Sequence, residues 1–199
     1  KSDSLVVVLG WNPDLIKTGF DSEHIPFVVN ENWEEGIASS MQAGLRFLMK
    51  KEHPDQVILM LVDQPFVDSK LLDRLILEKE NSGKGIGVCS YSETLGVPAI
   101  FDQSYFEEML HLKGFEGAKK VILKNSADVF AIDFPLGAVD LDTEDDLDRL
   151  KNWKILGLEN WKIGKLGFKV GKFEGLKVCL CERLKEFDLQ YFLILKRLG

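Results

Sequence analysis

Cysteine, histidine and proline are scarce in this chain, and it has no long apolar run. Its 199 residues include 3 Cys, 3 His and 6 Pro, too few cysteines for the disulfide framework of a small secreted scaffold. No apolar run approaches the roughly 20 residues of a membrane-spanning helix, and no signal peptide opens the chain. These absences predict a cytoplasmic globular protein with no membrane partner. The scattered histidines His24, His53 and His111 are expected on its surface.

Charge is unevenly distributed along the chain, whose net charge is −7. Residues 1–151 carry 15 Lys and Arg against 27 Asp and Glu, a balance of −12, whereas residues 152–199 carry 10 against 5, a balance of +5. An acidic body argues against nucleic-acid binding, which requires a basic face. The charge break predicts a main domain over residues 1–151 and an atypical, basic, repeat-like tail over residues 152–199.

Segments of strand type and helix type alternate through the first 151 residues. Short β-branched runs predict buried strands, and apolar residues three or four positions apart predict helices. Strands are expected at 5–9, 25–29, 57–62, 86–89, 97–101 and 129–132, and helices at 36–51, from 69 onward, 106–112, 116–124 and 143–151. This alternation predicts an α/β three-layer sandwich around a mostly parallel sheet. Beyond residue 151 we expect an amphipathic helix over 176–198 and no further strand of the main sheet. The apolar residues at 192–195 are expected either to dock on the surface of the domain or to cover an exposed edge of its sheet.

Two acidic segments are candidates for metal binding. Asp63 ends the most apolar strand, at the edge where parallel sheets bind ligands, and its carboxylate suits Mg²⁺. A cap on the following turn explains the same aspartate. In the acidic run 140–146, Asp140 and Asp142 share one side of an extended chain, so Asp140 is a second candidate ligand. A solvated helix start is the alternative for this run.

Small and hydroxyl residues mark two further candidate contacts. Gly36, Ser39 and Ser40 open the helix expected at 36–51, and free N–H groups at a helix start attract anions. A plain helix entry, with Trp33 packed against it, accounts for the same pattern. Gly96 and the proline two residues later indicate either backbone close to a ligand or a simple turn into a strand.

Taken in order, these segments resemble the molybdenum cofactor cytidylyltransferases, within the wider family of cofactor and sugar-phosphate nucleotidyltransferases. The resemblance covers residues 5–150, and each motif is weak alone but the ordered set is specific. The matching residues are Asn30 with Trp33-Glu34-Glu35-Gly36, Ser39-Ser40 and Gly44-Leu45; Asp63-Gln64-Pro65; Gly96 with Pro98; Gly114 with Gly117-Ala118-Lys119; and Asp140-Leu141-Asp142-Thr143 with Asp146-Leu147.

The resemblance implies a Rossmann-like enzyme that uses Mg²⁺ to transfer CMP from CTP to a phosphorylated pterin, the molybdopterin cofactor. It gives the catalytic and metal-binding roles to Asp63 and Asp140. It implies that a further set of residues contacts the substrates: Trp33, Gly36, Ser39, Ser40, Gln64, Pro65, Gly96 and Pro98.

The chain departs from the family pattern at its start and at Phe115. The family opens with a strand and a Gly-rich loop that wraps the triphosphate, and this chain begins at Lys1, just before the second strand. The resemblance therefore implies an N-terminally truncated domain that is inactive as given. Phe115 stands where the family usually has Asp. The alternative function is a non-catalytic remnant or binding module, and the chain order opposes a glycosyltransferase that uses Asp140 and Asp142 as its metal motif.

Overall fold

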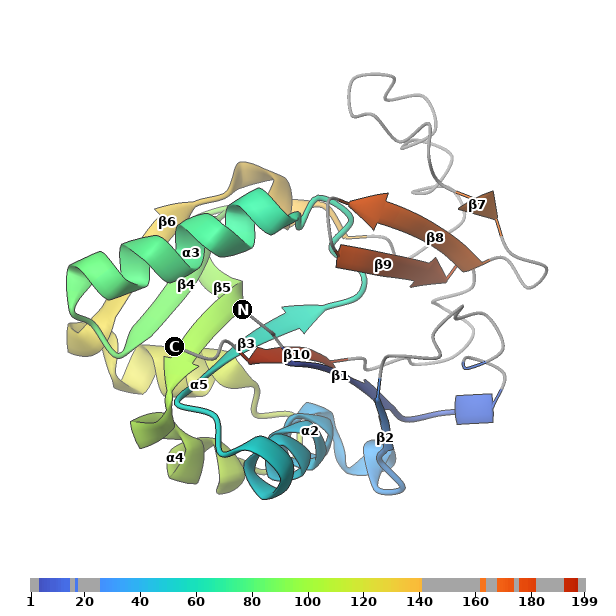
Figure 1. Cartoon of the computed structure of the whole chain (residues 1–199). Helices are drawn as coiled ribbons and strands as arrows, with labels where there is room; N and C mark the ends of the chain where they lie inside the picture. The colour runs from blue at the N-terminus through green and yellow to red at the C-terminus, as the bar shows by residue number, and fades with distance from the viewer. Residues whose placement is uncertain are drawn as a thin grey trace.

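A seven-stranded mixed sheet forms the centre of the molecule, in the order β2-β1-β10-β3-β5-β4-β6 (Figure 1). The computed structural model describes residues 4–14, 17, 26–140, 162–163, 168–173, 176–181 and 192–196. The strands of this sheet are β1 (Ser4–Leu9), β2 (Phe27–Val29), β3 (Gln56–Leu61), β4 (Ile86–Tyr91), β5 (Thr94–Asp102), β6 (Val129–Asp133) and β10 (Phe192–Lys196). Those formed before residue 140 confirm the predicted strands to within a few residues.

The directions of the strands determine which loops lie together at one edge of the sheet. Strands β1, β2, β3, β4 and β6 all run one way, and β5 and β10 run the other way. The sheet is therefore mixed rather than purely parallel. A two-residue turn joins β4 to β5, and both of its residues, Ser92 and Glu93, have positive φ, of 46° and 59°, as a tight hairpin requires. This hairpin therefore lies at the edge of the sheet where β1 and β3 also end, and β5 starts from that edge.

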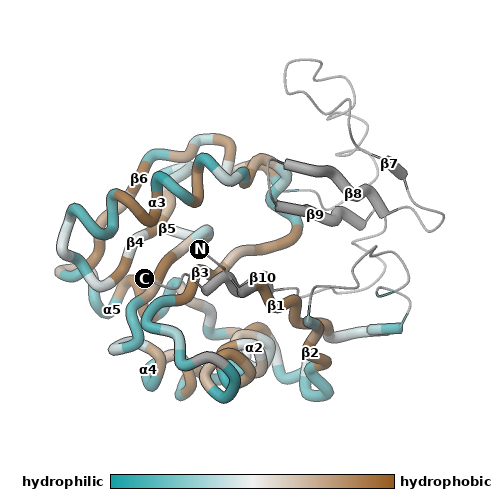
Figure 2. The backbone as a smooth tube through the Cα atoms, viewed as in Figure 1, coloured by the Kyte–Doolittle hydropathy of each residue, from teal (hydrophilic) through white to brown (hydrophobic). Residues whose placement is uncertain are grey.

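Helices cover both faces of the sheet and confirm the α/β three-layer architecture (Figure 1). The helices on one face pack against buried side chains of β1, β3, β4 and β5; they are α2 (Ile37–Glu52), α4 (Phe106–Leu110) and α5 (Ala118–Lys124). Helix α3 (Ser69–Ser82) covers the opposite face through its buried leucines and isoleucine. Figure 2 shows hydrophobic residues concentrated along the strands between these layers. Four short 3-10 helices lie in the connections between these elements: η1 (Trp33–Glu35), η2 (Gln103–Tyr105), η3 (Ser126–Asp128) and η4 (Pro135–Ala138).

Strand β10 lies between β1 and β3 and is antiparallel to both. Leu193 pairs with Val7 on one side and Met60 on the other, and Ile194 pairs with Val6 and Leu59. The expectation that no strand of the main sheet follows residue 151 is therefore wrong. The physical reason is that a short, continuous apolar run suits a strand flanked on both sides by buried strands.

A separate antiparallel sheet is formed by β7 (Lys162–Ile163), β8 (Phe168–Phe173) and β9 (Leu176–Cys181). The amphipathic helix predicted over 176–198 is therefore wrong wherever the structure describes that range, because both described segments are strands. The helix predicted at 143–151 lies outside the described residues. The division of the chain at residue 151 stays a prediction.

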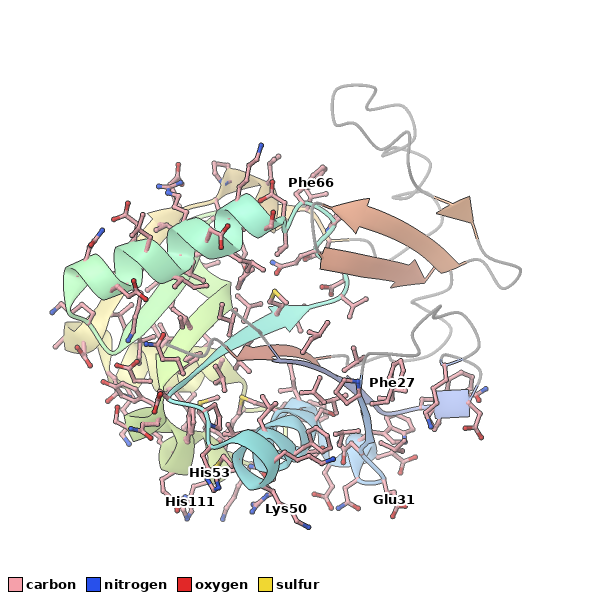
Figure 3. The ribbon with its side chains drawn as sticks, viewed as in Figure 1. Phe27, Glu31, Lys50, His53, Phe66 and His111 are labelled. Atoms are coloured by element: carbon pink, nitrogen blue, oxygen red, sulfur yellow. The ribbon has the colours of Figure 1, made fainter. Side chains whose placement is uncertain are left out.

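The surface positions of two histidines are confirmed. His53 and His111 are exposed, at the ends of α2 and α4, and Figure 3 shows them on the same side of the molecule; His24 lies outside the described residues. Within the part of the chain that the structure describes, no helix has both the length and the apolar character needed to cross a membrane.

Candidate functional site

The candidate site lies at the sheet edge where β1, β3 and β4 end and β5 begins. Asp63 follows β3 after one intervening residue, and Tyr91 is the last residue of β4. In Figure 3, Phe66 marks this edge beside the start of α3, and His53 lies just ahead of the opposite, amino end of β3. The edge is therefore the one at which α/β sheets bind ligands.

Asp63 is half-buried at this edge, and it does not cap the following helix. The N-cap of α3 is Asp68, whose Oδ1 accepts a hydrogen bond from the backbone N–H of Leu71 at 2.8 Å. Helix capping is thus carried by a different aspartate in the same segment. The carboxylate of Asp63 stands next to Gln64, which is buried.

The pKa of Tyr91, at the end of β4, is shifted by burial and by several of its neighbours. Burial raises the pKa of Tyr91, a hydrogen bond from Gln64 lowers it, and the negative charges of Asp140 and Asp63 raise it again. Asp140 itself is exposed. The two carboxylates that the sequence singled out, 77 positions apart, thus both act on the pKa of the same phenol.

The residues present fit a divalent cation of the Mg²⁺ type. Among the described residues, no three His, Cys, Asp or Glu side chains gather as a metal cluster. Mg²⁺ needs less than that, because it keeps several waters and binds through one or two carboxylates together with substrate phosphates. Asp63 and Asp140 supply two carboxylates, and they lie at an edge that is open to solvent on the Asp140 side.

The start of α2 is built around a close backbone contact. Gly36 has φ of 107°, which favours glycine, and a Cβ placed on it would lie 2.5 Å from the carbonyl oxygen of Gly114. That oxygen accepts a hydrogen bond from the backbone N–H of Ala38 at 3.1 Å. The two Gly-containing motifs that the sequence singled out, around Gly36 and Gly114, therefore touch each other.

The hydroxyls of Ser39 and Ser40 are hydrogen-bonded within the fold. The amide nitrogen of Asn30 donates to Ser39 Oγ at 2.8 Å and to Ser40 Oγ at 2.9 Å. Ser39 Oγ also lies 2.8 Å from the carbonyl oxygen of Gly36. Ser40 is fully buried, whereas Ser39 is half-buried. The substrate contacts expected of both serines stay predictions, and Ser39 is the one whose position reaches the surface.

Packing accounts for several other predicted contacts. Trp33 packs against Gly10 so closely that a Cβ placed on Gly10 would lie 2.8 Å from the Trp33 Cβ. Pro65 and Pro98 are buried. A Cβ on Gly96 would lie 2.3 Å from the Tyr91 hydroxyl oxygen, so the room that Gly96 leaves is filled by the phenol.

The segment from Gly114 to Lys119 is tied to the beginning of β5. Lys119 Nζ donates to Thr94 Oγ1 at 2.7 Å. Phe115 is 82% exposed, which places the residue that departs from the family pattern on the surface. Lys119, one of the residues that carry the family resemblance, therefore has a protein partner at the same sheet edge.

Tyr91 is the site residue that reasoning from sequence did not find. Its signal was an aromatic residue at the end of a buried strand, immediately before a polar two-residue turn and five positions ahead of Gly96. This pattern points to the site only when the directions of β3 and β4 are known. The two strands run the same way, so Asp63 and Tyr91, which lie at their carboxyl ends, are at the same edge of the sheet.

Three solved structures are similar to this chain over about three quarters of its length. Rv0371c from Mycobacterium tuberculosis H37Rv is 28% identical, with a TM-score of 0.60, covering 74% of this chain and 75% of that chain. The same protein in complex with manganese is 27% identical, with a TM-score of 0.59 and coverage of 74% and 77%. An Rv0371c homologue from Mycobacterium sp. strain JC1 is 24% identical, with a TM-score of 0.59 and coverage of 73% and 72%, which supports the fold alone.

The curated proteins contain no match to this sequence. The family described as MobA-like NTP transferase domain matches residues 1–129, more than half of the chain. That range holds the strands β1 to β5, the Asp63 segment and the start of α2. The chain therefore belongs to the family of MobA-like NTP transferase domains.

Proposed function

We propose that this chain is a nucleotidyltransferase domain whose metal site is formed by Asp63 and Asp140. The observation that supports this most directly is geometric: Gln64, the residue after Asp63, has its Nε2 3.1 Å from the carbonyl oxygen of Gly137, three residues before Asp140. This link lies in a chain of the NTP transferase family. Two carboxylates at the carboxyl edge of the sheet match the ligand set that Mg²⁺ uses together with substrate phosphates.

The proposed reaction is transfer of a nucleotidyl group from a nucleoside triphosphate to a phosphorylated acceptor. An acceptor phosphate oxygen bonds to the α-phosphorus, the bond from that phosphorus to the oxygen bridging to the β-phosphate breaks, and pyrophosphate leaves. Catalysis of this kind consists mainly of positioning and charge neutralisation. A divalent cation held by Asp63 and Asp140 would neutralise phosphate charge, and the chain itself contributes the fixed places of the two carboxylates.

The substrate-contact residues of the proposal divide into two groups along the sheet edge. The first group follows β3 or lies within β5, which begins at the same edge of the sheet: Gln64, Pro65, Gly96 and Pro98. Trp33, Gly36, Ser39 and Ser40 surround the start of α2. Of this second group, Ser39 and Trp33 are half-buried rather than fully enclosed, and they are the side chains with surface available to a substrate.

For the finer identity of the substrates, we propose CTP as the donor and a phosphorylated pterin as the acceptor. Both follow from the likeness of the chain's motifs to the molybdenum cofactor cytidylyltransferases. Mg²⁺ is the proposed cation, and the manganese complex of Rv0371c supports a divalent ion in a related protein. Because a nucleoside triphosphate is a cytoplasmic substrate, the proposed location is the cytoplasm.

Release of pyrophosphate tests the proposed reaction. In a chain carrying the family's Gly-rich loop ahead of β1, we expect release that requires Mg²⁺, a nucleoside triphosphate and the pterin acceptor. Asp63→Asn should lower the rate on the order of 100-fold, since one charged ligand of the cation is lost, without changing the circular dichroism spectrum.

Asp68→Asn is the matched control, because asparagine caps a helix as well as aspartate does. Its rate should stay near that of the unsubstituted protein. If Asp63→Asn retained full Mg²⁺-dependent activity, the metal role of Asp63 would be wrong. If the loop-bearing protein bound CTP and metal without releasing pyrophosphate, the site would belong to a binding module instead.

A further inference from the structure

The buried amide of Gln64 joins three segments at the candidate site. Gln64 is 3% exposed. Its Nε2 lies 3.2 Å from the carbonyl oxygen of Val97 in β5, 3.1 Å from the carbonyl oxygen of Gly137 in η4, and 3.4 Å from the hydroxyl oxygen of Tyr91 in β4. One side chain therefore links the segment after β3 to three other elements.

Tyr91 is held in place beside Gln64 by two glycines. A Cβ on Gly96 would lie 2.3 Å from the Tyr91 hydroxyl oxygen, and a Cβ on Gly137 would lie 2.6 Å from Tyr91 Cδ1 and equally close to Phe134 Cδ1. The ring thus fills the space that both glycines leave. Glycine at positions 96 and 137 is explained by the fit around this phenol.

The bond between Gln64 and Gly137 connects the two segments that carry the carboxylates. Gln64 directly follows Asp63, and Gly137 comes three residues before Asp140. The oxygen of the Gln64 amide, Oε1, is buried with no hydrogen-bond partner among the described residues. A buried acceptor without a hydrogen-bond partner lowers the stability of the fold, so the amide oxygen does not explain why glutamine stands at this position. The NH₂ group does explain it, because it reaches the carbonyl oxygens of Val97 and Gly137.

We propose that Gln64 and Tyr91 are positioning residues that fix the separation of Asp63 and Asp140. This inference rests on the proposed function, in which these carboxylates hold the divalent cation. Gln64 acts by tying the Asp63 segment to Gly137, and Tyr91 acts by filling the space between Gly96 and Gly137. Neither side chain needs to touch the cation for this role, because partners of this kind orient the ligands themselves.

Titration with Mn²⁺, followed by electron paramagnetic resonance of the free and bound ion, tests this inference on the 199-residue chain. Gln64→Met keeps the length of the side chain and removes its NH₂ group. We expect it to weaken Mn²⁺ binding about tenfold or more, the loss usual when a group that orients a metal ligand is removed. Tyr91→Phe removes only the hydroxyl and should weaken binding less while changing the spectrum of the bound ion.

Gln42→Met is the matched control. Gln42 Nε2 donates to the carbonyl oxygen of Leu112 at 2.7 Å, so this substitution also removes an amide bond to a backbone carbonyl, but away from the two carboxylates. It should leave Mn²⁺ affinity and the bound spectrum unchanged, even where the melting temperature falls by as much as for Gln64→Met.

The outcomes separate the two proposals. Unchanged Mn²⁺ affinity and spectrum in both Gln64→Met and Tyr91→Phe would overturn the positioning role. If Gln64→Met does not fold, Tyr91→Phe decides alone, because the hydroxyl that it removes both fills the space at Gly96 and lies 3.4 Å from Gln64 Nε2. If Asp63→Asn binds Mn²⁺ as tightly as the unsubstituted chain, the proposed metal site itself is wrong and the positioning role falls with it.

Discussion

Asn30 holds together the segment that leads into α2. Its amide nitrogen donates to Ser39 Oγ and Ser40 Oγ, and its Oδ1 accepts from the backbone N–H of Asn32 at 3.1 Å. The side chain is 6% exposed, so these hydrogen bonds are largely shielded from solvent. The motif around Asn30 is therefore a structural one first, and any role in binding depends on the position it gives to Ser39.

Asn30→Ala should lower the free energy of unfolding by about 2 kcal/mol, because it leaves buried polar partners unsatisfied. Urea denaturation followed by circular dichroism measures this loss. The control is Asn81→Ala on the exposed side of α3, which should change stability by less than about 0.5 kcal/mol. Equal and small effects for both substitutions would contradict the structural role of Asn30.

The position of a single residue in the fold was predictable where a chemically distinctive side chain directly follows a recognisable strand. Asp63 comes just after an apolar strand and two residues before Pro65, so its place at the carboxyl edge of the sheet was predictable. Gly96 also stood out, but nothing in the local pattern indicated that its missing side chain makes room for Tyr91. That information lies in the pairing of β4 with β5, where Tyr91 pairs with Thr94 and Ser90 with Leu95.

At the scale of elements, β10 is the main difference between expectation and structure. The local pattern of residues 176–198 suits an amphipathic helix, whereas Phe192–Lys196 forms a strand between β1 and β3. Its partners are far away in sequence, and a non-local pairing of this kind leaves no trace in local periodicity. The helices and strands before residue 140 were predictable because periodicity is a local property of the sequence and does not depend on which strand is the partner.

Deletion of residues 182–199 should destabilise the molecule strongly. It removes β10 and leaves β1 and β3 with unpaired, facing edges in the middle of the sheet. We expect the melting temperature to fall by more than about 10 °C, the shift that corresponds to a loss of several kcal/mol in a chain of this length.

The control for this deletion is removal of residues 197–199 alone, which leaves the strand Phe192–Lys196 complete. Its melting temperature should stay within about 2 °C of that of the full chain. If the longer deletion also melted within that margin, the segment after residue 181 would be dispensable, and β10 would not contribute to the stability of the sheet.

At the scale of the whole molecule, an acidic protein must bind an anionic substrate. The net charge is −7, and residues 1–151 alone carry a balance of −12. A triphosphate would be repelled by such a surface unless a cation or a set of N–H groups compensates for its charge. In the proposed site, a divalent cation held by Asp63 and Asp140 would offset two negative charges and so reduce the repulsion of the substrate phosphates.

The number of Mn²⁺ ions bound per chain, measured by electron paramagnetic resonance, tests the metal site most directly. We expect one ion bound at the edge formed by Asp63 and Asp140, lost in Asp63→Asn and retained in Asp68→Asn, whose side chain still caps α3. Loss of the ion in Asp63→Asn alone would support the site. Undiminished binding in Asp63→Asn, or equal loss in both variants, would contradict it.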